Sequence, residues 1–390
     1  MENNLFVGRP LKVLWICGLP FQVQREVFPG EDLGAYADWS WILGHLPPPP
    51  DVELHIACGH RKHARLRTFH YQGAAFHLVP LKIRARIFFL FQLDWLFFRE
   101  LVRQLQPDVI HGWGTEDSHA ISAIRLARRN VVEVQGNINE YRRRVGMPWL
   151  SLLCAWSERL ALKRAFCVAA ENDYSLQSAL PMIRTKRTYA IEHPIRPDFL
   201  TAPPTDGVSR QILFLGRIEE GKGIWDALEA FEKAGLPDWK LAVVGSGTPA
   251  DVARLKQWTD SSPCKGRVTH YPRLAPSEIV TLMQQSSVFL LPTRIDTGPT
   301  ALKESMAMGL WPVCYDNSGP GHYIRKFNFG NLAEDLSVES LTRTLKRAIE
   351  TREWIQPEKR SIIASQIRPS FDRNHIWSRL IAMYRRVCSD

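Results

Sequence analysis

Short apolar segments alternate along the chain with longer segments whose apolar residues recur at helical spacing. The strand-like segments of the first half are residues 12–16, 52–57, 75–79, 109–111, 131–134 and 167–170, and the helix-like segments between them are residues 93–105, 118–128 and 150–163. The strand-like segments of the second half are residues 212–215, 240–244, 268–270, 288–291 and 311–314. This alternation predicts an α/β fold with parallel, doubly wound sheets that helices cover on both faces.

Two such units are expected, because 390 residues correspond to about two domains of ordinary size. Residues 192–208 contain four prolines and follow neither the helical nor the strand period, which predicts a linker. An N-terminal domain is therefore placed at residues 1–200 and a C-terminal domain at residues 206–370. The apolar residues of the last segment, 371–390, have helical spacing, so it is expected to pack back on the first domain as a crossover helix.

The formal net charge of +10 favours anionic partners such as nucleotide diphosphates, anionic lipid or nucleic acid. No nucleic-acid-binding motif accompanies the charge, so nucleic acid is not expected. The seven cysteines are scattered without a CxxC pair, which argues against a zinc site or a disulfide framework and fits a reducing compartment. The longest apolar stretch, residues 87–98, is shorter than the roughly 20 residues of a membrane-spanning helix, and no signal peptide opens the chain, so we expect a cytoplasmic protein.

A basic, glycine-rich loop from Gly216 to Gly223 follows one of the strand-like segments. Glycines let backbone N–H groups approach phosphate oxygens, Arg217 can bind two oxygens at once, and Lys222 supplies a point charge. The spacing is close to that of a Walker A loop. Gly223 stands where the magnesium-binding hydroxyl is required, however, which argues against an NTPase. The alternative is a solvated basic turn that binds no ligand.

A second loop, GSGTPA at residues 245–250, lies between a strand-like and a helix-like segment. It formally matches the dinucleotide fingerprint G-x-G-x-x-A, which makes an NAD-type oxidoreductase the main alternative function. The acidic residue that should follow about 20 positions later, at the end of a second strand, is not in place, because Asp260 comes too early. The loop is interpreted as a neighbour of a phosphate or a ribose, or only as a tight turn.

The motif DTGPTALKE, residues 296–304, follows the apolar strand-like segment VFLLP. Pro299 suits the first turn of a helix, so Asp296 is expected on the preceding loop and Glu304 in the second turn. The free N–H groups at the start of a helix form an anion site, and carboxylates accept hydrogen bonds from sugar hydroxyls. The motif therefore predicts a site for a phosphate-linked sugar. A capped helix with a surface glutamate is the alternative.

These three motifs, in this order, resemble those of the retaining glycosyltransferases of family 4, which have the GT-B fold. The resemblance extends more weakly to the first half, through CGLP at residues 17–20, PDVIH at 107–111 and QGN at 135–137. It implies two Rossmann-like doubly wound domains that face each other across a cleft, with a C-terminal crossover helix. It also implies sugar transfer from a nucleotide-diphosphate-sugar, such as a UDP- or GDP-sugar, with retention of anomeric configuration and with neither a cofactor nor a metal.

The resemblance assigns a role to each residue at a matching position. Arg217 and Lys222 would bind the donor diphosphate, Glu304 the ribose, and Asp296 the transferred sugar. The further donor contacts that it implies are Gly18, Gly216, Gly245, Arg273, Leu274, Thr297, Gly298, Pro299 and Thr300.

Two positions depart from the pattern of that family. Its first motif acid is usually glutamate, whereas this chain has Asp296, and Trp113 replaces a histidine that many members carry near the reacting sugar. A nucleotide-sugar-binding homologue without activity is therefore a second alternative. His119 is a further catalytic candidate, and Trp113, Glu116 and Asn137 are candidates on the acceptor side.

The first domain is expected to hold a glycan or lipid-linked acceptor, as in polysaccharide, lipopolysaccharide or glycolipid synthesis. Basic and aromatic residues are mixed within residues 61–67, 82–89 and 142–149. Such segments can bind the surface of an anionic membrane, so peripheral contact with its inner face is kept as a hypothesis. For Phe88, Phe89, Phe97 and Phe98, the favoured interpretation is that they are core residues of a helix that covers the sheet.

Overall fold

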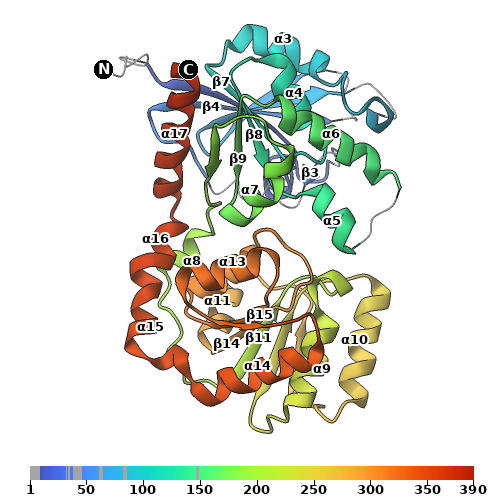
Figure 1. The fold of residues 1–390 in the computed structure, drawn as a ribbon, viewed down its shortest axis with the longest axis vertical. Coiled ribbons are helices and arrows are strands. Elements are labelled where there is room, and N and C mark those ends of the chain that lie inside the picture. The colour runs from blue at the N-terminus through green and yellow to red at the C-terminus, as the bar shows by residue number, and fades with distance from the viewer. Residues whose placement is uncertain are drawn as a thin grey trace. The chain divides into compact units, whose positions relative to one another are not determined.

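The computed structural model describes residues 9–31, 33, 36–37, 46–60, 65–81, 86–145 and 149–390. The chain forms two compact units, of which one comprises Met1–Pro194 with Arg373–Asp390 and the other Ile195–Asp372 (Figure 1). Each unit has its own sheet and its own hydrophobic core. The basic segments 61–64 and 82–85 that were considered for membrane contact lie outside the described residues, as does 146–148.

The sheet of the N-terminal unit has the strand order β10-β9-β8-β7-β1-β4-β6-β5. Every neighbouring pair is parallel except β5 with β6. Its strands are β1 (Leu11–Cys17), β4 (Val52–His60), β5 (Arg67–Tyr71), β6 (Ala74–Pro80), β7 (Val109–Trp113), β8 (Asn130–Val134), β9 (Cys167–Ala170) and β10 (Thr188–Ala190). The sequence pattern did not predict the β5–β6 hairpin, whose turn residues Gln72 and Gly73 both have positive φ, as a tight hairpin turn requires.

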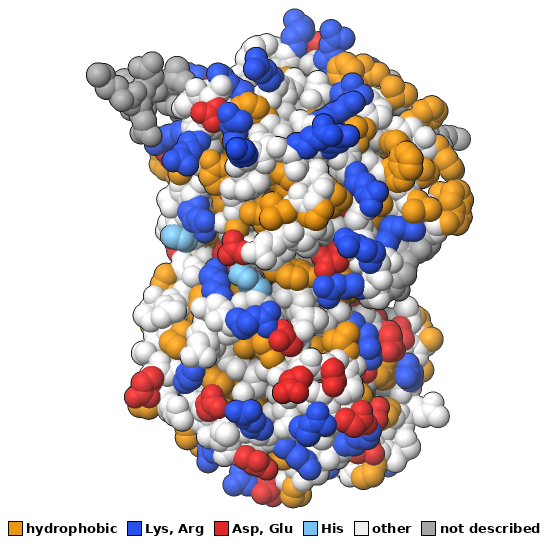
Figure 2. Space-filling view, in the orientation of Figure 1, with side chains coloured by type: hydrophobic (Ala, Val, Ile, Leu, Met, Phe, Trp, Pro, Cys, Tyr) orange, Lys and Arg blue, Asp and Glu red, His pale blue; other side chains and the backbone are white. Residues whose placement is uncertain are grey.

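Helices flank this sheet, and a two-stranded ribbon of β2 (Leu19–Pro20) and β3 (Tyr36–Ala37) lies beside it. The helices are α1 (Phe21–Val27), η2 (Arg86–Phe89), α3 (Trp95–Leu105), α4 (Ser118–Leu126), α5 (Ile138–Val145), α6 (Ser151–Arg164), α7 (Asp173–Ala179) and η3 (Leu180–Met182). Phe98 on α3 is buried and Phe97 is half-buried, as a sheet-covering helix requires. The same expectation is wrong for Phe88 and Phe89, because η2 lies on the surface, where hydrophobic side chains gather (Figure 2). Among the described helices, none combines the length and the hydropathy needed to cross a bilayer.

The sheet of the C-terminal unit has the strand order β13-β12-β11-β14-β15-β16, with all neighbours parallel. Its strands are β11 (Gln211–Leu215), β12 (Lys240–Val244), β13 (Val268–Tyr271), β14 (Val288–Leu290), β15 (Trp311–Tyr315) and β16 (Asn331–Ala333). Its helices are α8 (Pro197–Thr201), η4 (Glu220–Lys222), α9 (Ile224–Ala234), α10 (Pro249–Ser261), α11 (Pro276–Gln284), α12 (Thr300–Ala307), α13 (Ser318–Phe327), α14 (Val338–Thr351), η5 (Glu353–Ile355), α15 (Pro357–Ile362), η6 (Ile363–Ile367) and α16 (Arg368–Ser370).

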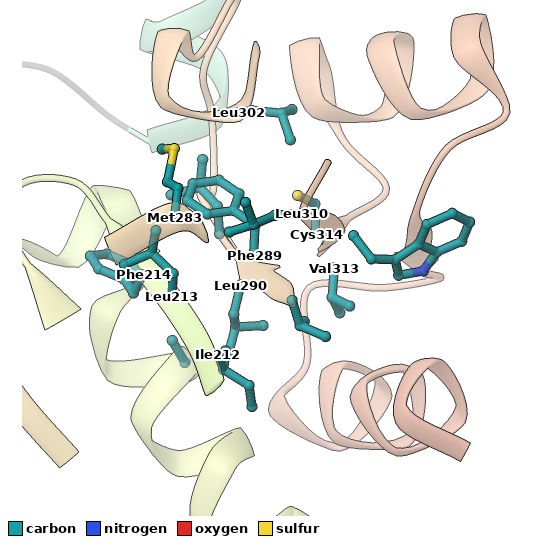
Figure 3. Packing of buried hydrophobic residues seen from close by; sticks show 14 of the residues in the cluster. Ile212, Leu213, Phe214, Met283, Phe289, Leu290, Leu302, Leu310, Val313 and Cys314 are labelled. Atoms are coloured by element: carbon teal, nitrogen blue, oxygen red, sulfur yellow. The ribbon is translucent and has the colours of Figure 1, made fainter. Parts of the chain in front are cut away.

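The core of the C-terminal unit is built around the central strands (Figure 3). Phe214 on β11, Phe289 on β14 and Val313 on β15 are fully buried, and Leu302 packs from α12. Because helices cover both faces of a parallel sheet, its central strands are apolar on both sides, which explains their continuous hydrophobic runs.

Residues 192–208 were predicted to be a linker, and the boundary between the units does fall within them, after Pro194. The prediction is wrong for residues 195–208, because they are a packed part of the C-terminal unit. Phe199 on α8 is buried, and the N–H of Thr205 donates to the carbonyl of Met308 at 2.8 Å. The indole N–H of Trp354 donates to the carbonyl of Gly207 at 2.9 Å. The prolines prevent this segment from following a regular helical or strand period. Its backbone is instead held in place by hydrogen bonds with neighbouring elements.

The last helix, α17 (Arg373–Ser389), completes the core of the N-terminal unit. The ring of Trp377 stacks on that of Trp15 in β1, with 5.5 Å between the ring centroids. The Tyr384 hydroxyl accepts a hydrogen bond from the indole of Trp15 at 2.9 Å and lies 2.7 Å from Nδ1 of His111. The chain therefore returns to its first unit after forming the second.

Candidate functional site

The strand order of the C-terminal sheet indicates where a ligand would bind. The chain builds outward from β11 in one direction through β12 and β13, and then in the other through β14, β15 and β16. In open parallel sheets, ligands bind beyond the carboxyl ends of the strands where the order reverses. That point lies between β11 and β14, whose following loops carry the first and third motifs.

The loops after β11 and β14 contact each other directly. The carbonyl of Gly221 accepts hydrogen bonds from the backbone N–H of Arg294 at 3.1 Å and from the hydroxyl of Thr293 at 3.0 Å. Gly223 has a φ of 75°, and a Cβ there would lie 2.0 Å from the carbonyl oxygen of Pro292. Only glycine permits both this conformation and this approach.

Lys222 and Asp296 meet between these two loops. The Lys222 ammonium lies 2.6 Å from a carboxylate oxygen of Asp296. The Asp296 charge raises the pKa of Lys222, so the ammonium stays protonated across the physiological range. An ammonium has three N–H donors, so Lys222 can bind Asp296 and an oxygen of a ligand at the same time.

The start of α12 lies next to this ion pair. The second carboxylate oxygen of Asp296 accepts the N–H of Gly298 at 3.2 Å. Pro299 is the N-cap residue and provides no side-chain cap to the helix that begins at Thr300, while Thr297 is buried just before it. Unbonded N–H groups and the helix dipole favour an anion at such a helix start.

Glu304 lies in the second turn of α12, as predicted, but it is buried and not a surface residue. Burial raises the pKa of Glu304 to about 7, against the opposing effect of the nearby cations Arg196 and Lys303. The Arg196 guanidinium lies 4.0 Å from the Glu304 carboxylate. A buried carboxylate at the sheet edge is suited to accept hydrogen bonds from ligand hydroxyls.

The first and second motifs are packed together through their backbones. The N–H of Gly216 donates to the carbonyl of Val244, and the N–H of Ile218 to that of Ser246. A Cβ on Gly245, whose φ is 156°, would lie 1.8 Å from the carbonyl oxygen of Gly216. Gly245 therefore lets the two loops approach each other. Because its loop follows β12 and not β11, this placement does not fit a dinucleotide fingerprint.

Three other predicted residues lie at the same carboxyl edge of the sheet. Arg217 is exposed and its guanidinium is 3.1 Å from the carboxylate of Glu219. Arg273 is exposed and Leu274 half-buried on the loop after β13. The N–H of Gly245 donates to the carbonyl of Tyr271, the last residue of that strand, which places the loops after β12 and β13 side by side.

The start of α13 was not predicted as part of the site. The Ser318 hydroxyl accepts the N–H of Asp296 at 3.1 Å, and the N–H of Gly319 donates to the Asp296 carbonyl at 2.8 Å. A Cβ on Gly319 would lie 2.2 Å from the carbonyl oxygen of Thr297. The sequence signal was NSGPG at residues 317–321, a glycine-rich helix start directly after a strand.

Arg294 was also not predicted. Its guanidinium lies 2.7 Å from the buried carboxylate of Asp226 on α9, which also accepts the hydroxyl of Tyr315 at 2.8 Å. This network connects the loop after β14 to α9 and β15, so it holds the loop in place. Its members are far apart in the sequence and follow no motif.

The candidates of the N-terminal unit lie around the equivalent switch point, between β1 and β7. Gly18 follows β1 directly, and Trp113 is the last residue of β7. Trp113 is buried, stacks on His111 with 4.6 Å between the ring centroids, and its indole N–H has no hydrogen-bond partner among the described residues. His119, in the first turn of α4, donates from Nδ1 to the Trp113 carbonyl at 2.9 Å.

Glu116 and Asn137 lie on the loops after β7 and β8. Glu116 accepts the N–H of Gly136 at 3.2 Å, and burial together with the neighbouring charge of Glu158 raises its pKa to about 7. The Asn137 carbonyl oxygen accepts the N–H of Glu140 at 3.0 Å at the start of α5, and its amide donates to Ser178 at 3.1 Å. This arrangement makes Asn137 a buried helix cap and favours a positioning role over direct contact with an acceptor.

Among the described residues, no three His, Cys, Asp or Glu side chains gather in a way that would hold a metal ion.

Comparison with known proteins agrees with this geometry. Residues 199–368 match the family model "Glycosyl transferases group 1". An uncharacterized glycosyltransferase of Haemophilus influenzae is 26% identical over 163 residues, which are 40% of this chain and 45% of the relative. A GDP-mannose:cellobiosyl-diphosphopolyprenol alpha-mannosyltransferase of Xanthomonas campestris is 24% identical over 216 residues, 54% of this chain and 56% of the relative. The similarity thus spans about half the length of these curated relatives.

Solved structures are similar over nearly the whole chain. Sucrose-phosphate synthase of Thermosynechococcus elongatus superposes with a TM-score of 0.73 at 14% identity, covering 96% of this chain and 98% of the other. The HepE protein of Anabaena in complex with UDP gives a TM-score of 0.70 at 14% identity, with the same coverage. The chain therefore has the GT-B fold, with two Rossmann-like parallel sheets, and its C-terminal unit carries the match to the glycosyl transferases group 1.

Proposed function

We propose that this protein is a glycosyltransferase that takes a sugar from a nucleotide-diphosphate-sugar and transfers it with retention of anomeric configuration. The observation that carries the proposal is the meeting of three features at one switch point: the Lys222–Asp296 pair, the start of α12 and the buried Glu304. A diphosphate suits the cations and the helix start, and a ribose and a hexose suit the two carboxylates. The family match of the same unit and the names of the relatives support the same class.

In the proposed reaction, the bond between the anomeric carbon and the diphosphate breaks, and negative charge accumulates on the leaving phosphate. Arg217, Lys222 and the N–H groups at the start of α12 would stabilise this charge, each well-placed donor by roughly 3–4 kcal/mol. Asp296, held by Gly298 and Ser318, would bind the transferred sugar. In this proposal, the cations and the N–H groups stabilise the negative charge of the leaving phosphate, and the reaction requires neither a metal nor another cofactor.

Retention follows if the acceptor attacks from the face that the diphosphate leaves. A phosphate oxygen then accepts the proton of the acceptor hydroxyl, so the protein need not supply a dedicated base. In this proposal the N-terminal unit holds the acceptor, with Trp113, Glu116 and His119 around its switch point, while Gly18 contacts the donor. A glycan or lipid-linked acceptor, used at the cytoplasmic face of a membrane in polysaccharide or glycolipid synthesis, fits this assignment.

A nucleotide-sugar-binding homologue without activity is the second candidate, because Asp296 is one methylene shorter than the usual glutamate and Trp113 stands where a histidine is common. The local geometry favours activity. The Asp296 carboxylate accepts one hydrogen bond and forms an ion pair, and the Asp296 backbone N–H donates to Ser318. These contacts indicate a carboxylate held in position and not a degenerate loop.

The test is a screen of UDP- and GDP-sugars, since the named relatives involve both bases. A preferred donor should raise the unfolding temperature, and the protein should then release nucleoside diphosphate from it, with and without EDTA. Proton NMR of the first product would give the anomeric configuration. Binding without any turnover would support the inactive homologue, and a preference for NAD(H) over every sugar nucleotide would contradict both candidates.

A further inference from the structure

The N-terminal unit exposes an apolar surface that the proposed reaction does not use. Two tryptophans, Trp149 just before α6 and Trp156 in the second turn of α6, are 67% and 65% exposed. Phe88 and Phe89 on η2 are 60% and 54% exposed. Large aromatic side chains with this exposure are unusual on a soluble surface unless it contacts another apolar phase or a partner.

These side chains belong to one surface because η2 lies against α6. The hydroxyl of Ser157, next to Trp156, donates to the carbonyl of Leu90, which directly follows η2, at 3.3 Å. Phe91 is buried and anchors the segment, while Leu93 and Leu96 further along are 39% and 46% exposed. Figure 2 shows hydrophobic side chains gathered over this part of the N-terminal unit.

The outer face of α6 changes from apolar to basic along its length. Leu152, Trp156, Arg159 and Lys163 are all exposed, and their spacing of four, three and four residues places them in one row along the helix. Ala155 and Leu162 face the interior. The helix therefore presents an apolar start followed by two cations, and a tryptophan next to cations is typical of a surface that contacts the headgroup region of a bilayer.

Further cations lie beside this surface on α3 and α4. A shallow cavity of about 570 Å³ between these helices is lined by Arg99, Arg103 and Arg125, together with Trp95 and Val102. Arg99 is one turn beyond Leu96 on the same helix. Guanidinium groups bind phosphate oxygens well, and Arg103 is already paired with Glu100 at 2.7 Å. Anionic headgroups therefore match the charge of Arg99 and Arg125 beside the apolar residues.

We propose that this surface, the Trp149–Trp156 end of α6 with η2 and the neighbouring arginines of α3 and α4, docks the protein on an anionic lipid bilayer. The aromatic and leucine side chains insert at the level of the headgroups, and Arg159, Lys163 and the cavity arginines contact lipid phosphates. This inference goes beyond the donor chemistry and does not depend on it, because none of these side chains belongs to the proposed donor site.

Flotation with vesicles tests the proposal. The full chain should bind vesicles of phosphatidylcholine mixed with phosphatidylglycerol, bind vesicles of phosphatidylcholine alone more weakly, and dissociate as salt is raised. Trp149→Ala with Trp156→Ala should lower the partition coefficient at least roughly tenfold, because it removes the apolar contact. Arg159→Gln with Lys163→Gln should abolish most of the preference for the anionic vesicles.

The matched control is Leu336→Ala with Ile355→Ala, two exposed apolar residues of the C-terminal unit, which should leave partition within about twofold. Unfolding temperatures should stay equal in all variants, and Lys222→Ala should bind vesicles like the wild type, which separates this proposal from the proposed reaction. No binding to anionic vesicles at low salt overturns the proposal. A dimer in light scattering that Trp149→Ala with Trp156→Ala dissociates, without vesicle binding, would assign the surface to a second copy of the chain and overturn it as well.

Discussion

The two sheets have the same kind of switch point but surround it with different charges. Beyond β11 and β14, each carboxylate has a cation within 4.0 Å, Lys222 for Asp296 and Arg196 for Glu304. Beyond β7 in the N-terminal unit, Glu116 instead accepts a backbone N–H, and the neighbouring carboxylate of Glu158 helps to raise its pKa. One topology therefore carries a cation-rich site in one unit and a carboxylate- and aromatic-rich site in the other.

In the proposed function, this difference corresponds to donor binding in the C-terminal unit and acceptor binding in the N-terminal unit. A diphosphate needs cations and N–H donors, whereas the hydroxyls of an acceptor need hydrogen-bond acceptors and an apolar surface against which a sugar ring can pack. In the proposed function, the half-buried Glu116 would supply a hydrogen-bond acceptor of the second kind. Because fold alone does not determine function, the comparison between the two switch points must be tested through individual side chains.

The largest effect is expected at the cation-rich site. Lys222→Ala and Glu304→Ala should each lower donor turnover at least about a hundredfold, because each removes a charge-bearing contact to the donor. The measurement is release of nucleoside diphosphate under saturating donor, with thermal unfolding to show that the variants fold. Lys233→Ala on the exposed side of α9 is the matched control and should keep wild-type turnover. Wild-type turnover in either site variant would contradict the site assignment.

A smaller but distinct effect is expected where the two loops touch. Gly223→Ala would place a Cβ 2.0 Å from the carbonyl oxygen of Pro292 at a φ of 75°, so the loops after β11 and β14 must separate. We expect a loss of roughly tenfold in turnover and about 1–3 kcal/mol in the free energy of unfolding. Gly221→Ala in the same loop is the control, because a Cβ there meets nothing within 4 Å. If both variants behaved alike, the contact between the loops would not matter for the reaction.

The pH dependence of stability should distinguish Glu304 and Glu116, whose pKa values are raised, from ordinary glutamates. The pKa of Glu304 is raised to about 7 in the folded protein, so between about pH 4.5 and 7 the folded state holds a proton that the unfolded state releases. The free energy of unfolding should therefore fall as pH rises through this window, by about 3 kcal/mol for this group, and then level off. Glu304→Gln should remove this decrease, as measured by urea unfolding at several pH values.

Glu116→Gln provides the matched comparison in the other unit, since the pKa of Glu116 is also raised to about 7. Both variants should flatten the same part of the pH profile. Only Glu304→Gln should also weaken donor binding, because the proposed ribose contact belongs to the C-terminal unit. An equal loss of donor affinity in Glu116→Gln would contradict the division between the units.

Much of the C-terminal site followed from the sequence because its residues stand in short motifs at the ends of strands. Lys240–Val244 was predicted to the residue, and Asp296 and Glu304 lie on the loop and in the helical turn that Pro299 indicated. The ends of these strands can be found in the sequence because a strand of a parallel sheet is buried on both faces. Such a strand is therefore a continuous apolar run that stops where the strand ends.

What could not be predicted depends on contacts between distant segments. The hydrogen bond between Ser318 and Asp296 and the ion pair between Arg294 and Asp226 form only because the fold brings separate segments together. Residues 192–208 were predicted to be a linker because their prolines interrupt both the helical and the strand period. From residue 195 on, neighbouring elements nevertheless form hydrogen bonds with this backbone. Phe88 and Phe89 resembled core residues because hydrophobicity does not tell which apolar residues a fold leaves exposed.

The smallest expected effect concerns Asn137. It tests the comparison between the two switch points on the side of the N-terminal unit, where the acceptor is proposed to bind. Asn137→Ala removes the cap of α5 and should cost about 1 kcal/mol in the free energy of unfolding, while donor turnover without acceptor stays unchanged. Asn137→Asp keeps an oxygen at the cap and should restore most of the lost stability. Urea unfolding and acceptor kinetics measure both effects. If Asn137→Ala instead left stability intact and raised the KM for the acceptor alone, the side chain would contact the acceptor directly, and the carboxylate- and aromatic-rich site would extend to the loop after β8.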